Sequence, residues 1–273
     1  MKPVLPPIVS ADTVHDLLGG DRPPVVFDLR EPYRYSQGHI PGALPLDPAL
    51  FNRNTETARG LLPDADELNA QLRAHGVCAD RPVIVYDEDG GPAAARAAWT
   101  LRAFGHEAAA MLDGGLIHYA ARHRLARGKP PLNEDDGDFE GAWRRERIAD
   151  RRHILARLGA PDLQLVDTRS AAEYGGRDRR AWRAGHIPGA VHLDWRLTKG
   201  ADGRFLPEAA LRALLAERGL DPNKETICYC QSHQRSSVVC LLLEALGFTR
   251  VKGYPGAWSD WGNQPDTPVA AED

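Results

Sequence analysis

Two copies of one sequence pattern fill this chain, and the duplication constrains its fold more than any other feature. The string GHIPGA at Gly38–Ala43 recurs letter for letter at Gly185–Ala190, and the wider segments 25–47 and 164–194 match in the same order. An ordered match that contains six identical consecutive residues is far beyond chance, so we infer two copies of one domain.

Each copy alternates short apolar runs with amphipathic segments. Segments 83–106 and 226–248 both pass from an apolar run through a polar loop into a helical pattern. Segments 10–20 and 207–220 begin with residues typical of helix starts and end near glycine, as helices do. Strands that alternate with helices in this way predict an α/β fold with two tandem domains, each a mainly parallel sheet flanked by helices.

Length and composition agree with two domains. A chain of 273 residues with 42% hydrophobic residues is long enough for two domains that each bury a core. Residues 127–147 are rich in proline, glycine and acidic side chains, which is typical of a linker. We therefore predict a first domain at 1–126, a linker at 127–147 and a second domain at 148–273.

The second copy places a cysteine where an α/β protein binds ligands. Cys230 directly follows the apolar run 226–229, and a helical pattern follows the loop. Ligands of open α/β sheets bind beyond the carboxyl ends of the strands, where backbone N–H groups and a helix N-terminus favour anions. This position, with the charge of Arg235 nearby, favours a thiolate and makes Cys230 a candidate nucleophile. The rest of the predicted active-site loop is Gln231, Ser232, His233, Gln234 and Arg235.

The first copy has no cysteine at the matching position. Asp87 aligns with Cys230, and Glu88 and Asp89 follow it. A carboxylate cannot carry sulfur, so we predict that the first domain is catalytically inactive. These three carboxylates could hold a metal ion, but a solvated loop is the simpler interpretation, and we expect no metal site. Cys228 and Cys240 lie in apolar runs and are expected in the core.

The paired Asp-x-Arg, GHIPGA and cysteine-loop elements resemble those of tandem-domain rhodaneses, the thiosulfate sulfurtransferases. The resemblance covers residues 8–262, and the loop CQSHQRS is similar to the CQTHHRS loop of a bacterial subgroup. It implies an inactive first domain, an active second domain and a persulfide on Cys230. The implied reaction is a double displacement that moves sulfur from thiosulfate to cyanide or a thiol, without a metal or an organic cofactor.

The resemblance also implies that an arginine from the segment before the second GHIPGA binds the anionic donor. Ten residues stand between Tyr174 and Gly185, against two between the matching Tyr35 and Gly38, which makes an insertion of eight. The insertion is rich in arginine, and we expect Arg183, or next Arg180, to contact the donor. Arg235, Trp195, as a candidate pocket wall, and His233 complete the candidate substrate-binding residues.

Other shared residues are expected to be structural because the copy without the cysteine retains them. Asp28 and Arg30 match Asp167 and Arg169, which predicts a common salt bridge. The histidine of each GHIPGA string is expected to hydrogen-bond a backbone carbonyl.

Three alternative functions remain open at this stage. A 3-mercaptopyruvate sulfurtransferase would use the same persulfide, although its CGSGVT loop is absent here. A persulfide relay to a protein or thiol acceptor is a second alternative. A phosphatase or arsenate reductase is disfavoured, because such enzymes use Cys-x5-Arg loops, whereas Cys230 and Arg235 form Cys-x4-Arg.

Charge and composition exclude several partners. A net charge of −4 does not suit a nucleic-acid-binding protein. The first ten residues, MKPVLPPIVS, have no long apolar run, so we expect neither a secretion signal nor a membrane span. The cysteine spacing fits neither a zinc site nor a disulfide framework, which predicts free thiols in a reducing cytoplasm.

Overall fold

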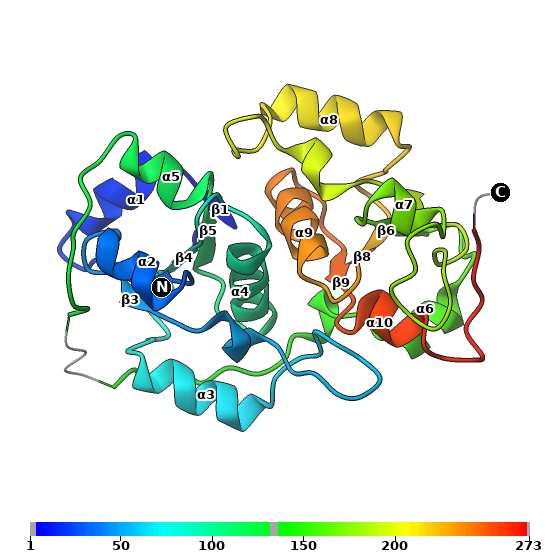
Figure 1. The fold of residues 1–273 in the computed structure, drawn as a ribbon, viewed down its shortest axis with the longest axis horizontal. Coiled ribbons are helices and arrows are strands. Elements are labelled where there is room, and N and C mark those ends of the chain that lie inside the picture. The colour runs from blue at the N-terminus through cyan, green and yellow to red at the C-terminus, as the bar shows by residue number, and fades with distance from the viewer. Residues whose placement is uncertain (1–3, 132–135, 272–273) are drawn as a thin grey trace. The chain divides into compact units, whose positions relative to one another are not determined.

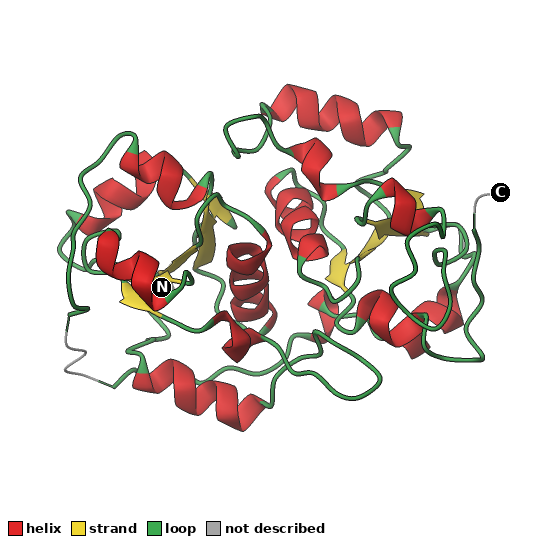
Figure 2. Cartoon of the chain, viewed as in Figure 1, coloured by secondary structure: helices red, strands yellow, loops and turns green. Residues whose placement is uncertain are grey.

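The computed structural model describes residues 4–131 and 136–271 (Figure 1). Contacts divide the chain into two compact units, each with a parallel sheet and surrounding helices (Figure 2). Unit 1 comprises Met1–Phe51, Pro63–Trp143 and Ala201–Phe205, and unit 2 comprises Asn52–Leu62, Arg144–Gly200 and Leu206–Asp273. The predicted α/β architecture with two similar domains is confirmed.

Unit 1 contains a five-stranded sheet with the order β1-β5-β4-β2-β3, and every neighbouring pair is parallel. Its strands are β1 (Ile8–Val9), β2 (Val25–Asp28), β3 (Leu44–Pro45), β4 (Val83–Tyr86) and β5 (Ala109–Leu112). Its helices are α1 (Ala11–Leu18), α2 (Pro32–Gln37), the 3-10 helix η1 (Pro48–Phe51), α3 (Ala65–Ala74), α4 (Pro92–Ala103) and α5 (Gly115–Ala120). The central strands are buried along their whole length, because helices cover both faces of a parallel sheet.

Unit 2 contains a four-stranded parallel sheet with the order β7-β6-β8-β9. Its strands are β6 (Leu163–Asp167), β7 (Val191–His192), β8 (Glu225–Tyr229) and β9 (Val251–Gly253). Its helices are η2 (Arg145–Arg147), α6 (Arg151–Arg157), α7 (Ala171–Tyr174), η3 (Trp195–Thr198), α8 (Glu208–Glu217), α9 (Arg235–Ala245) and α10 (Ala257–Trp261). Helix α9 packs against β8 and β9 and carries a run of buried apolar residues.

Helix boundaries follow the capping signals with one difference. Ser10 caps α1 by accepting a hydrogen bond from the N–H of Thr13, as the sequence indicates. Pro207, the first residue of the predicted helical segment 207–220, precedes α8, which begins at Glu208. Its extended backbone conformation still suits the start of a helix, and its missing N–H costs nothing there.

Each unit has the same hydrogen-bond network around its own GHIPGA turn. Arg30 donates to Asp28 and to the Gly38 carbonyl, and Arg169 makes the same bonds to Asp167 and Gly185. All of these side chains are largely buried, so the carboxylate must compensate each guanidinium. The predicted structural salt bridge is confirmed in both copies.

A stacked tyrosine and histidine complete this network in each unit. The His39 ring bonds the Tyr35 carbonyl through Nδ1 and stacks on the Tyr35 ring at 3.9 Å. His186 bonds and stacks on Tyr174 in the same way, at 3.7 Å. Both histidines therefore bond backbone carbonyls, as expected.

The compact units do not coincide with the repeats in the sequence. Residues 52–62 come from the first repeat but belong to unit 2, and residues 201–205 come from the second repeat but belong to unit 1. In the predicted linker, residues 132–135 lie outside the described part of the chain, and Asn69 binds the backbone of Gly141 through both ends of its amide. The described part of the linker therefore has specific contacts.

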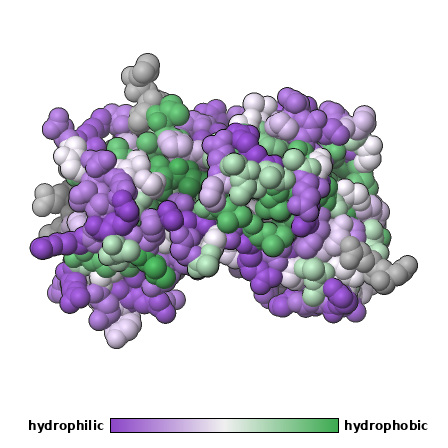
Figure 3. Space-filling view, turned by 90° about the horizontal axis from the view of Figure 1, so that it is seen from above, coloured by the Kyte–Doolittle hydropathy of each residue, from purple (hydrophilic) through white to green (hydrophobic). Residues whose placement is uncertain are grey.

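Among the described residues, the large exposed hydrophobic side chains include Trp182 and Leu197 of unit 2. The face displayed in Figure 3 is mainly hydrophilic, interrupted by smaller hydrophobic patches. Among residues 4–131 and 136–271, no helix is long and apolar enough to cross a membrane.

Candidate active site

Cys230 lies at the carboxyl end of β8, one of the two central strands of the unit 2 sheet. The strand is fully buried, and the loop 230–234 leads directly into α9. The side chain of Cys230 is itself buried, at 1% exposure. The Trp258 N–H donates to the Cys230 carbonyl at 3.0 Å, and the Ser259 N–H donates to the Gln231 carbonyl at 2.9 Å. The start of α10 therefore fixes the loop from one side.

Several backbone amide groups of the loop lack a hydrogen-bond acceptor among the described residues. Within the described part of the chain, no oxygen accepts a hydrogen bond from the N–H groups of Gln231, Ser232 or Gln234. Uncompensated N–H groups at the start of a helix favour an anion. The loop thus has the chemistry needed to hold a thiolate or a persulfide anion.

His233 supports the loop from inside. It is fully buried and adopts a left-handed backbone conformation with φ of 58°. Its Nδ1 lies 2.7 Å from the Ser236 hydroxyl, and its carbonyl accepts a hydrogen bond from the Ser237 hydroxyl. Because the imidazole is enclosed rather than exposed, we assign it first to shaping the loop.

Arg235 begins α9 and forms a two-bond ion pair with Glu173. Its Nη1 and Nη2 lie 2.6 Å and 2.8 Å from the two carboxylate oxygens. Burial opposes the charge of Arg235, but the bonds to Glu173 and the nearby Cys230 sulfur hold its pKa above the ordinary value. Burial likewise opposes ionisation of Glu173, yet Arg235 lowers the pKa of that carboxyl to about 2. Both groups are charged at neutral pH.

Glu173 is a site residue that the sequence analysis missed, although its local signal was present. Ser170 and Glu173 form a capping box at the start of α7, in which each side chain binds the other's backbone N–H. The spacing S-x-x-E is a known mark of such a box. The spacing could not reveal the second partner, Arg235, because that contact spans 62 positions.

The two candidate arginines of the insertion differ in their surroundings. The guanidinium of Arg183 donates to the carbonyls of Trp261, Gln264 and Thr267, and so holds the segment that follows α10. Arg180 is exposed and pairs with Asp178 at 2.8 Å. Its backbone carbonyl accepts a hydrogen bond from the Gln231 amide of the active-site loop at 3.0 Å.

Trp195 starts η3, and η3 packs against α9. The ring is half-buried, and its backbone N–H donates to the Thr168 carbonyl at 3.3 Å. This contact anchors η3 to the end of β6, where Asp167 and Arg169 stand. Trp195 is thus held close to the elements that frame the loop.

A hollow of about 390 Å³ opens beside the loop in unit 2. It is lined by Glu56, Thr57, Ala58, Arg59, Arg180, Ala181, Gln231, Ser232, Ser259 and Asn263. Two active-site loop residues, the insertion and the segment 52–62 therefore meet around one space. Sequence reasoning missed the contribution of 52–62, because no local pattern indicates which unit a connecting segment joins.

The matching place in unit 1 is occupied by a carboxylate. The Asp87 side chain accepts hydrogen bonds from the N–H groups of Gly91 at 2.8 Å and Ala94 at 3.0 Å. Burial raises the pKa of Asp87 above its ordinary value, although these amides act in the opposite direction. Among the described residues, no group of three His, Cys, Asp or Glu side chains is placed to hold a metal ion.

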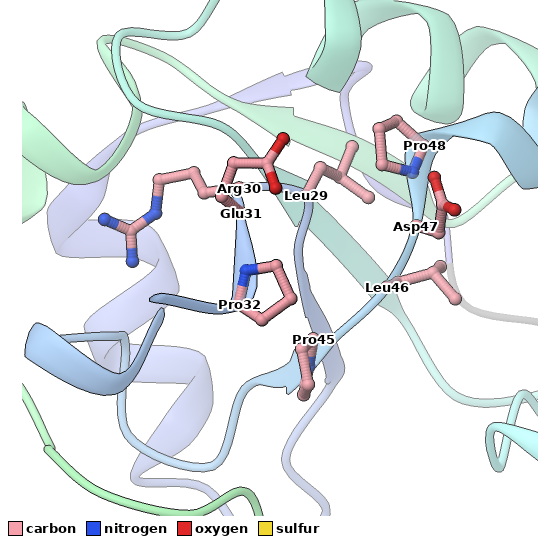
Figure 4. A pocket seen from close by; sticks show the side chains of 8 residues that line it. All are labelled: Leu29, Arg30, Glu31, Pro32, Pro45, Leu46, Asp47 and Pro48. Atoms are coloured by element: carbon pink, nitrogen blue, oxygen red, sulfur yellow. The ribbon is translucent and has the colours of Figure 1, made fainter. Parts of the chain in front are cut away.

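Unit 1 has a separate hollow of about 460 Å³ at the ends of β2 and β3 (Figure 4). Its lining is Leu29, Arg30, Glu31, Pro32, Pro45, Leu46, Asp47 and Pro48. The Arg30 guanidinium extends away from Asp47 and Pro48 and is held by Asp28 and the Gly38 carbonyl. None of these eight side chains is a nucleophile of the cysteine, serine or threonine type.

Comparisons with known proteins agree with this geometry. The family model of the rhodanese-like domain matches residues 10–122 and again 151–264. The chain is 38% identical over 246 residues to a thiosulfate sulfurtransferase of Azotobacter vinelandii, covering 90% of each protein. The chain belongs to the rhodanese family.

A further relative and a solved structure are also similar to this tandem rhodanese. It is 34% identical over 239 residues to a 3-mercaptopyruvate sulfurtransferase of Escherichia coli, covering 86% of this chain and 84% of the relative. The anaerobic ergothioneine biosynthesis enzyme from Chlorobium limicola shares the fold, with a TM-score of 0.86 and 24% identity. That match covers 98% of this chain and 70% of the other.

Proposed function

We propose that this rhodanese is a thiosulfate sulfurtransferase that works by double displacement through Cys230. The single observation that carries the proposal is the buried Cys230 at the end of β8, at the start of a loop with N–H groups that lack acceptors among residues 4–131 and 136–271. The name of the Azotobacter vinelandii relative supports thiosulfate as the donor.

Each half-reaction moves one sulfur atom. The Cys230 thiolate attacks the outer sulfur of thiosulfate, a new S–S bond forms, and the old S–S bond breaks with its electron pair leaving on sulfite. Cyanide or a thiolate then attacks the outer sulfur of the persulfide. The cysteine thiolate leaves with the electron pair of the S–S bond, which regenerates the enzyme.

The surrounding residues have separate roles in this proposal. The N–H groups of the loop and the charge of Arg235 stabilise the thiolate and the persulfide anion, and the burial of Cys230 strengthens both interactions. Glu173 holds Arg235 in place through two hydrogen bonds. We assign the donor contact to Arg180 before Arg183, because the carbonyls of 261–267 already occupy the Arg183 guanidinium.

The reaction needs no metal or organic cofactor in this proposal, because the cysteine itself carries the sulfur. The free cysteines Cys78, Cys228, Cys230 and Cys240 suit a reducing cytoplasm, where we place the enzyme. Mercaptopyruvate is the second candidate donor, supported by the Escherichia coli relative. It would form the same persulfide and release a carboxylate product.

The test is an intact mass measured before and after excess thiosulfate, and again after cyanide. The expected result is a gain equal to one sulfur atom on Cys230, which cyanide then removes. If thiosulfate gives no gain and mercaptopyruvate does, the donor assignment is wrong. If neither donor adds sulfur, Cys230 is not a sulfur carrier.

A further inference from the structure

The hollow beside the active-site loop extends beyond Arg180, the proposed donor contact, to Glu56 and Arg59 of the segment 52–62. We propose that it is the subsite for the natural sulfur acceptor, and that this acceptor is a small thiol with both carboxylate and ammonium groups. The inference rests on the proposed function, since it takes the Cys230 persulfide as the sulfur source. A space of about 390 Å³ is far larger than cyanide needs and lies in the range of sites for small organic ligands.

The hollow is a built feature, because three segments are tied together around it. The Asn263 side chain accepts a hydrogen bond from the Trp182 N–H and donates to the carbonyls of Thr57 and Ser259. One amide therefore connects the insertion, the segment 52–62 and α10. The Arg59 N–H adds a bond to the Ser259 hydroxyl at 2.8 Å.

The segment 52–62 also packs directly against the active-site loop. Its two sides pair at Arg53 and Leu61, so it forms a short hairpin. Gly60 adopts φ of +71°, and a Cβ there would lie 1.9 Å from the Ser232 carbonyl oxygen. Only glycine fits this close approach, which sets the hairpin against the residue two positions after Cys230.

The charges that line the hollow match a ligand of mixed charge. The Arg59 guanidinium has no ion-pair or hydrogen-bond partner among the described residues, and the Glu56 carboxylate has none there either. Arg180 is already paired with Asp178. The hairpin thus offers one uncompensated cation for a carboxylate and one uncompensated anion for an ammonium group.

A buried hydrogen-bond acceptor, the side-chain oxygen of Gln231, lies on the side of the hollow formed by the active-site loop. Within the described part of the chain, Gln231 Oε1 is buried without a hydrogen-bond donor, while the Nε2 of the same amide binds the Arg180 carbonyl. A buried oxygen in this state costs free energy until a ligand N–H or O–H reaches it. Because Gln231 follows Cys230, a ligand that binds it lies beside the sulfur that is transferred.

The test compares acceptors of defined charge on the full chain, with thiosulfate saturating. Glutathione supplies both charges, 3-mercaptopropionate supplies the carboxylate alone, and 2-mercaptoethanol supplies neither. Arg59→Ala is expected to lower the preference for either carboxylate thiol over 2-mercaptoethanol about fivefold, the effect of an exposed ion pair. Glu56→Gln is expected to lower the preference for glutathione over 3-mercaptopropionate, because only glutathione has an ammonium group.

Arg53→Ala is the matched control, since Arg53 is an exposed arginine of the same hairpin that does not line the hollow. It is expected to leave these preferences as they are in the wild type. If Arg59→Ala changes the turnover with all three thiols by the same factor, or changes the turnover with none of them, the inference is overturned. Wild-type enzyme that turns over cyanide but shows no preference for glutathione also overturns it, whereas failure with cyanide overturns the proposed function instead.

Discussion

The two units place different groups in the same anion-binding position. In unit 1 the Asp87 side chain accepts bonds from the N–H groups of Gly91 and Ala94, and thereby fills the position with a group of the protein itself. In unit 2 the shorter thiol of Cys230 stands there, and the N–H groups of Gln231 and Ser232 have no acceptor in the described part of the chain. The fold therefore supplies the position, and the residue at the strand end decides whether a substrate can use it.

The surroundings of the two positions are otherwise closely alike. The N–H of Leu116 donates to the Asp87 carbonyl at 3.0 Å, just as the N–H of Trp258 donates to the Cys230 carbonyl. The turn before each donor has positive φ, at Gly115 in unit 1 and at Ala257 in unit 2. The supporting turn is thus common to both units, and the loop is the part that differs.

The largest expected effect comes from the residue that differs. Cys230→Ser removes the sulfur carrier and should reduce sulfur transfer to the background rate, because a serine cannot form a persulfide. Turnover of thiosulfate with cyanide measures this, and Asp87→Asn in unit 1 serves as the control that keeps activity. Transfer that survives in Cys230→Ser would place the carrier elsewhere in the chain.

The next prediction compares two ion pairs, Arg235 with Glu173 in unit 2 and Arg30 with Glu88 in unit 1. Arg235→Ala leaves the buried Glu173 without its partner and should cost about 3 kcal/mol of unfolding free energy, with roughly a hundredfold loss of turnover. In unit 1, Arg30 lies 3.4 Å from the half-exposed Glu88, so Glu88→Gln should cost less than about 1 kcal/mol. Denaturant unfolding of both variants checks the comparison, and equal costs would refute it.

The two buried carboxyls should change stability with pH in opposite directions. Arg235 holds the folded pKa of Glu173 at about 2, below its ordinary 4.5, so its stabilisation is present above pH 4.5 and is lost as the pH falls toward 2. The unfolding free energy of wild type relative to Glu173→Gln should fall by about 2 kcal/mol as the pH falls through that range, allowing for partial screening.

Asp87 supplies the contrast. Burial raises its folded pKa above the ordinary 3.8, so the wild type should lose stability relative to Asp87→Asn as the pH rises above 3.8. Unfolding curves at several pH values measure both differences. Slopes of the same sign would show that the two carboxyls occupy similar environments.

The smallest expected effect tests the insertion that unit 1 lacks. Arg180→Ala should raise the KM for thiosulfate about threefold, as expected for an exposed charge that contacts an anion. Arg183→Ala should instead cost about 2 kcal/mol of stability, because three carbonyls lose their donor. A larger KM change in Arg183→Ala than in Arg180→Ala would return the donor contact to Arg183.

Sequence alone predicted the features that depend on local pattern and repetition. The apolar run before Cys230 predicted the strand, and the helical pattern after it placed the loop between them. The repetition of strands and helices predicted the parallel sheet. Sequence alone could not predict contacts that depend on tertiary packing, such as the pairing of Arg235 with Glu173. The carbonyl partners of Arg183 were hidden for the same reason, because they lie 78 to 84 positions away.

The hairpin at 52–62 has a consequence for how this protein can be divided. Each repeat in the sequence lacks a segment of the compact unit that it mainly forms, since 52–62 and 201–205 are encoded in the opposite halves. A chain divided between the two repeats would therefore yield two fragments, neither of which carries a complete unit. The first repeat, which has Asp87 at the position of Cys230, therefore still encodes part of the wall of the hollow beside the active-site loop.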